Sequence, residues 1–160
     1  MKTVWSPWRM EYIDNPDKPL GCVFCREAAR EDGPENLIVA RGANAFVILN
    51  RYPYTSGHLM IVPYSHLPTL ETLDASTRAE IMELANRAVA VLRLVYRPDG
   101  FNLGINIGSA AGAGIADHVH LHVVPRWTGD TNFMSTVSET RVLPEDLPAT
   151  YARVRSAWEG

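Results

Sequence analysis

The sequence predicts an α+β domain, with a mostly antiparallel sheet and a long helix packed on one face. Several short β-prone runs come first, one long helical pattern follows them, and further β-prone runs come after it. The chain has 160 residues, which is enough for one domain with its own core. We therefore expect a single domain over 1–160, consisting of an N-terminal segment (1–36), a core (37–127) and a C-terminal extension (128–160).

Three strands are predicted in the first half of the core. Residues 37–40, 45–50 and 58–63 are rich in aliphatic and β-branched side chains, and a turn-rich segment separates the last two runs. Short connections of this kind favour antiparallel neighbours, so the three runs predict a meander. Before them, loops are predicted at 14–19 and 30–36, and a turn between these loops should lead into a short helix.

The second half begins with a long helix and ends with a weaker one. From about Asp74, apolar residues recur at helical spacing, Thr77 and Glu80 form a candidate capping box, and Arg97-Pro98-Asp99-Gly100 stops the pattern. A strand at 101–107, a glycine-rich loop and a β-prone run at 118–126 follow. A weakly amphipathic helix is expected within 144–158. The apolar positions of the long helix are Ile81, Leu84, Ala88, Leu92 and Val95.

Composition narrows the classes of function. The formal net charge is −3, which argues against a broad surface for nucleic acid. No apolar run reaches membrane-spanning length, and the first residues contain no hydrophobic signal core. We therefore expect a cytoplasmic protein whose partner is a small molecule, with no nucleic acid and no membrane.

Three of the five histidines alternate with apolar residues, at His118, His120 and His122. Side chains alternate between the two faces of a strand, so the three imidazoles should share one face at a spacing of about 6.6 Å. The intervening apolar side chains should then enter the core. Three unpaired imidazoles suit a packed strand poorly, so the pattern indicates a chemical site.

Cys22 and Cys25 are the only cysteines, and the Cys-x-x-Cys spacing supplies half of a tetrahedral zinc site. Two further ligands would have to come from the five histidines. A redox pair is disfavoured because the βαβ context of a thioredoxin-like motif is missing. The remaining alternative is a pair of reduced, buried cysteines.

A glycine-rich loop lies immediately before the histidines, from Gly108 to Gly114. A backbone with few Cβ atoms allows N–H groups to approach an anion closely. The loop lacks the Gly-Lys-Ser/Thr of a P-loop, and no helix follows it as in a dinucleotide fingerprint. By itself such a loop is more often a plain turn.

The run His-x-His-x-His followed by two apolar residues resembles the motif of the histidine-triad (HIT) superfamily. The resemblance also includes 5–12, 52–63 and 127–133, and so covers most of the chain. Within the superfamily the chain resembles most the branch of dinucleoside polyphosphate hydrolases and bacterial diadenosine tetraphosphate phosphorylases. The resemblance implies a HIT-like α+β fold and a homodimer formed through the long helix and an edge strand.

The resemblance also implies site residues and a chemistry. The middle histidine, His120, would attack an α-phosphorus and form a nucleotidyl-histidine intermediate, with His122 contacting phosphate or the leaving oxygen and His58 supporting the site. The expected nucleotide-binding residues are Asn50, Asn106, Gly108, Gly112, Gly114 and Trp127.

Zinc-bearing members of the superfamily imply a structural Zn site at Cys22, Cys25, His66 and His118, because four protein ligands leave no open position for water. Spacing alone leaves His58 as an alternative to His66.

One departure bears on the second reaction step. Hydrolase-type relatives carry a glutamine and a hydroxyl residue where this chain has Gly114 and Ile115. The acceptor is therefore phosphate or water, and the room at Gly114 favours phosphate.

Three alternatives stay open, and the last two are from other classes. One is a purine nucleoside phosphoramidase-type HIT hydrolase. Another is a metal-dependent hydrolase in which the triad binds the ion, although Asp117 is the only nearby carboxylate. The third is a catalytically silent nucleotide-binding module.

Overall fold

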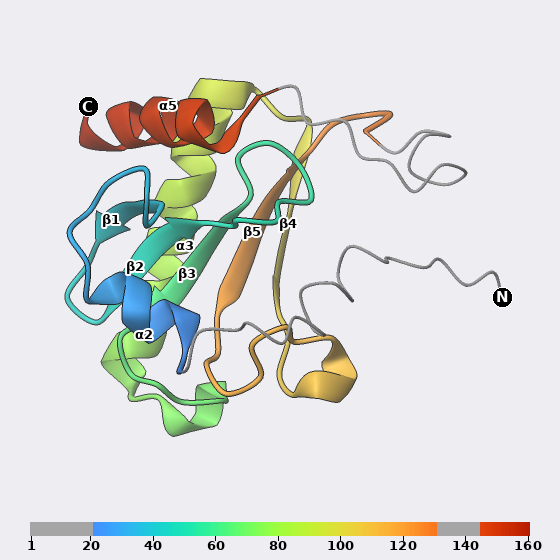
Figure 1. Ribbon diagram of the computed structural model, residues 1–160. Helices are drawn as coiled ribbons and strands as arrows, with labels where there is room; N and C mark the ends of the chain where they lie inside the picture. Colours follow the sequence, from blue (N-terminus) through green and yellow to red (C-terminus); the bar gives the residue numbers. More distant parts are fainter. Residues whose placement is uncertain (1–20, 131–144) are drawn as a thin grey trace, which may run out of the picture.

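The computed structural model describes residues 21–130 and 145–160, and its centre is one five-stranded sheet (Figure 1). The strand order is β1-β2-β3-β5-β4, and every neighbouring pair is antiparallel. The α+β fold with an antiparallel sheet is therefore confirmed. The strands are β1 (Ile38–Arg41), β2 (Ala45–Leu49), β3 (Leu59–Pro63), β4 (Gly100–Ile105) and β5 (Leu121–Arg126).

The helices cover both faces of the sheet. The long helix α3 (Ala75–Tyr96) crosses one face and the short helix α2 (Val23–Ala28) lies over the other (Figure 1). Every residue of β2 and β3 is buried, as this two-sided cover requires. The predicted meander is present as β1, β2 and β3, and the predicted short helix after the first cysteine is α2.

Helix α3 begins differently from the predicted capping box. Asp74 is the N-cap, and its carboxylate accepts a hydrogen bond from the Thr77 backbone N–H at 2.7 Å. Glu80 instead accepts from the N–H groups of Ala43 at 2.7 Å and Asn44 at 2.5 Å, in the turn between β1 and β2. The capping-box prediction was wrong because Asp74 starts the helix three residues earlier, which leaves Glu80 to fasten that turn.

The C-terminal helix α5 (Leu147–Glu159) packs against α3 and β1. Trp158 is buried, and its backbone carbonyl accepts a hydrogen bond from Arg87 of α3 at 2.6 Å. Arg155 donates to the Val39 carbonyl of β1 at 2.9 Å. The predicted tail helix therefore completes the core on the α3 side of the sheet.

The histidine run enters the sheet later than its alternation predicts. The Val119 N–H donates to the Leu67 carbonyl at 2.8 Å, so the loop after β3 holds this part of the chain, and regular pairing begins at Leu121. Val119, Leu121 and Val123 are buried as predicted.

Within the described residues, no helix is both long enough and apolar enough to span a bilayer.

Candidate active site and metal cluster

A cavity of about 800 Å³ opens on the α2 side of the sheet. Ile48, Met60 and His122 lie side by side on β2, β3 and β5 and contribute to its lining. Helix α2 and residues 114–117 add further lining, and His120 lies beside His122 with ring centroids 4.8 Å apart. The size and mixed lining are typical of a site for a small organic ligand.

The backbone fixes the tautomer of His120. Its Nδ1 lies 2.8 Å from the His118 carbonyl oxygen, which can only accept, so Nδ1 carries the proton and donates it. The lone pair of the neutral ring is then on Nε2. Burial lowers the pKa of His120 and so favours this neutral form near pH 7. His120 thus has the protonation state that an imidazole nucleophile needs.

His122 is fixed by a second imidazole instead of a carbonyl. The Tyr54 N–H donates to Nδ1 of the fully buried His58 at 3.2 Å, so neutral His58 carries its proton on Nε2. That Nε2 lies 2.9 Å from Nδ1 of His122 and donates to it. His122 therefore presents Nε2–H as a hydrogen-bond donor, whereas His120 presents a lone pair.

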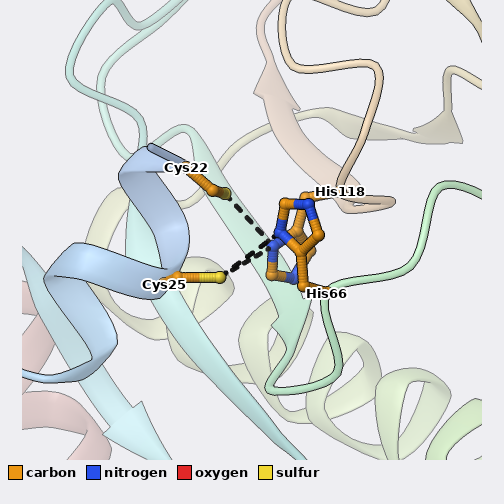
Figure 2. Close-up of side chains that lie close together, drawn as sticks. All are labelled: Cys22, Cys25, His66 and His118. Carbon is orange, nitrogen blue, oxygen red and sulfur yellow. Dashed lines mark hydrogen bonds between the residues drawn. The ribbon is translucent and has the colours of Figure 1, made fainter. Parts of the chain in front are cut away.

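Beside the cavity, two cysteines and two histidines converge (Figure 2). Cys22 is the N-cap of α2 and Cys25 lies in its first turn, His66 follows β3, and His118 precedes β5. Their candidate ligand atoms all lie within 4.8 Å of one another. Among residues 21–130 and 145–160, no other group of three or more histidine, cysteine or acidic side chains has this geometry.

Three sulfur–nitrogen distances in this cluster are close to the edge of a zinc tetrahedron. Sγ of Cys22 lies 3.3 Å from Nδ1 of His118, and Sγ of Cys25 lies 3.4 Å from Nδ1 of His66 and 3.7 Å from Nδ1 of His118. Zn–S and Zn–N bonds of about 2.3 and 2.0 Å at tetrahedral angles separate S and N by about 3.6 Å. Nε2 of His118 donates to the Pro63 carbonyl at 2.8 Å, which leaves Nδ1 free of a proton. The donor set therefore fits Zn²⁺.

Of the expected nucleotide-binding residues, Asn50 and Gly114 line the cavity. Asn106, Gly108, Gly112 and Trp127 do not line it, and their role stays a prediction. Gly108 and Gly112 have φ of 79° and 84°, a backbone region that favours glycine, and they flank the 3-10 turn Ser109–Ala111. The structure also separates the two candidates for the fourth metal ligand, since His66 lies in the cluster and His58 pairs with His122.

Sequence reasoning missed the contribution of α2 to the cavity. Phe24 packs its ring 4.9 Å from that of His120, and Arg26 and Glu27 also line the cavity. Phe24 and Glu27 are three residues apart, which puts them on one face of a helix. That spacing, next to the cysteine pair, is the signal that could have identified them.

The fold and the site define the class of protein, and comparison with known families agrees. Residues 33–129 match the family model of the HIT domain. The chain belongs to the HIT domain family.

Within that family, the chain is 37% identical over 170 aligned residues to the AP-4-A phosphorylase of Mycobacterium tuberculosis, covering 99% of this chain and 85% of the relative. It is 34% identical to the adenylylsulfatase HINT3 of Arabidopsis thaliana, with 81% of this chain and 64% of that protein covered. Among solved structures, a Zn-bound histidine triad family protein from Mycobacterium smegmatis has a TM-score of 0.69 and 30% identity, covering 88% of this chain and 94% of that one.

Proposed function

We propose that this protein cleaves dinucleoside polyphosphates such as diadenosine tetraphosphate through a nucleotidyl-His120 intermediate. The observation that carries the proposal is the 2.8 Å hydrogen bond from Nδ1 of His120 to the His118 carbonyl, because it leaves the Nε2 lone pair for the attack. The similarity to an AP-4-A phosphorylase supports the choice of substrate class.

In the first step, Nε2 of His120 attacks an α-phosphorus, a P–N bond forms, and the P–O bond to the leaving nucleotide breaks. His122 directs its Nε2–H toward the phosphate or the leaving oxygen and stabilises the charge that develops there. His58 holds His122 in this orientation through the 2.9 Å contact. In the second step, an acceptor oxygen attacks the same phosphorus and the P–N bond breaks, which restores neutral His120.

The acceptor that we favour is inorganic phosphate. Gly114 lines the cavity in place of a larger polar residue, so a second anion has room beside backbone donors. Diadenosine tetraphosphate with phosphate should give ATP and ADP, whereas water as acceptor gives ATP and AMP. With isotopically labelled phosphate, the label should appear in ADP; accumulation of AMP at the same rate with the label still free would identify a hydrolase.

We further propose that Cys22, Cys25, His66 and His118 hold one structural Zn²⁺. When bound, the ion would join α2 to the segment before β5 without taking part in the chemistry, because four protein ligands close its coordination. Metal analysis of protein purified without chelators should find about one zinc per chain. A metal-free protein of the same stability would refute this assignment.

We also propose a homodimer, in which the β4 edge and α3 meet the same elements of a second copy. β4 is the last strand of the sheet, with Leu103 45% exposed, and Leu94 of α3 is 72% exposed. Sedimentation should give the mass of two chains for the wild type, and the mass of one chain for Leu103→Arg.

The location that we propose is the cytoplasm, where a reducing environment suits the two free thiols.

A further inference from the structure

The α2 end of the cavity contains a buried acid that the proposed mechanism does not use. Glu27 is about one helical turn after Phe24, so the two side chains lie on one face of α2, and both are buried and line the cavity. The side chain of Glu27 is only 7% exposed. Burying a carboxylate carries a large desolvation cost unless it gains partners, so its position requires an explanation.

Two arginines contact this carboxylate and leave it able to accept more hydrogen bonds. Arg26 Nε lies 3.1 Å from Oε1, and Arg30 donates to Oε2 at 2.8 Å. A carboxylate has about four acceptor positions, and these two bonds occupy one on each oxygen. Arg26 and Arg30 are 39% and 48% exposed, so water could solvate both without Glu27. The two arginines therefore do not need Glu27 as a buried counter-ion.

The cavity that Glu27 lines also has apolar walls, which suit an aromatic ring. Phe24, Leu37 and Ile48 are buried apolar residues among its lining. Leu37 has φ of 63°, a strained value for a leucine, and the Asn36 side chain supports this conformation by accepting from the Ile38 N–H at 3.2 Å.

The amide of Asn36 also connects the acid to this wall. Its Nδ2 donates to the Glu27 carbonyl at 3.3 Å, and its Oδ1 accepts from the Gly33 N–H at 3.1 Å. Asn36 is 1% exposed. Asn36 thus fastens the backbone of α2 at Glu27 to the segment that carries Leu37.

We propose that Glu27 accepts a hydrogen bond from the exocyclic amino group of a purine such as adenine, and so selects the base that this cavity binds. This inference rests on the proposed function, because it assigns the base that the same site recognises. A buried acceptor discriminates strongly against a ligand that lacks the matching donor, since the acceptor is then left unpaired. Glu27 would thus determine specificity and would not touch the reacting phosphorus.

The test measures binding of mononucleotides to the intact protein by calorimetry. AMP should bind at least about ten-fold more tightly than purine riboside 5′-monophosphate, which lacks only the 6-amino group. Glu27→Met removes the acceptor at similar size and should reduce this ratio to about one. Glu31→Gln removes an exposed acid of the same segment and should leave the ratio unchanged.

A second variant keeps the test valid if Glu27→Met does not fold. Glu27→Gln presents an amide donor, so it should improve binding of IMP, whose C6 carbonyl accepts, relative to AMP. If Glu27 has only a structural role, its replacement should weaken the binding of all these nucleotides equally and leave both affinity ratios as in the wild type. That result would overturn the assignment of Glu27. Failure of the wild type to bind any nucleotide would overturn the proposed function as well.

Discussion

The metal cluster and the nucleotide cavity use histidines that are two residues apart in opposite ways. At His118, Nε2 donates to the Pro63 carbonyl and the Nδ1 lone pair faces the thiols. At His120, Nδ1 donates to the His118 carbonyl and the Nε2 lone pair is left for chemistry. Identical side chains thus receive different tasks from the backbone oxygen that each one meets. The comparison also predicts different consequences of mutation, because one imidazole would stabilise the fold and the other would react.

The largest effect is expected for His120→Ala. Loss of a covalent nucleophile should reduce turnover of diadenosine tetraphosphate by several orders of magnitude, while the fold and nucleotide affinity stay nearly intact. Rapid-quench kinetics measures the turnover, and circular dichroism checks that the fold is intact. Retention of more than about a tenth of the wild-type rate would exclude the covalent mechanism.

The cluster should respond in the opposite sense to Cys22→Ser. Loss of a structural zinc should destabilise the fold by roughly 4 kcal/mol, or a melting temperature about 10 °C lower, because metal binding contributes folding free energy. The single-turnover rate of the molecules that remain folded should fall far less. Thermal melts with and without a chelator provide the measurement, and the wild type with chelator should match the variant. An unchanged melting temperature combined with a lost rate would instead indicate a catalytic metal.

An intermediate effect is expected for His58→Asn, which removes the imidazole that orients His122. We expect kcat to fall by about 10- to 100-fold, as is typical when a residue that orients a functional group is changed. KM should change little, because His58 does not line the nucleotide cavity. Steady-state kinetics on diadenosine tetraphosphate separates the two constants. An increase in KM with kcat preserved would instead show that His58 contributes to substrate binding.

The smallest effect should come from Asp74→Ala, which provides a reference because Asp74 belongs to neither site. Loss of the N-cap of α3 should lower the melting temperature by a few degrees at pH 7, with zinc content and turnover unchanged. Hydrogen bonds from Ser76 and Thr77 lower the pKa of Asp74 to about 2. The cap is therefore fully effective above the unfolded-state pKa of about 4, and the difference between variant and wild type should narrow as the pH falls from 4 toward 2. Thermal melts of both proteins between pH 4 and pH 2 check the direction of this change.

Local patterns predicted most of the fold. Runs of aliphatic and β-branched residues predicted β2 and β3 within one residue, and helical spacing predicted α3 from its first turn. The sequence could not show that Glu80 bonds to the turn at Ala43, because that contact depends on how α3 packs against the sheet. For the same reason it could not show that β5 begins only at Leu121.

The site was predicted unevenly for a similar reason. Residue types and spacing identified the cysteine pair and the three alternating histidines, and the resemblance to the HIT superfamily added His58 and His66. The structure brings these side chains together in two neighbouring groups. Glu27 lacks such a motif, and its relevance depends on its burial at a cavity whose other walls, such as Leu37, come from separate parts of the chain. The orientation of each imidazole also depends on tertiary contacts, such as the one from His58 to His122.

The hydrogen bond from His120 to the carbonyl of residue 118 has an evolutionary consequence. Every amino acid carries this oxygen, so a substitution at position 118 would remove a cluster ligand yet still supply the acceptor that sets the tautomer of His120. Descendants of this protein could therefore lose the cluster while keeping the nucleophile, provided that the surrounding core compensates for the lost stability. The two features can diverge independently even though they share a residue.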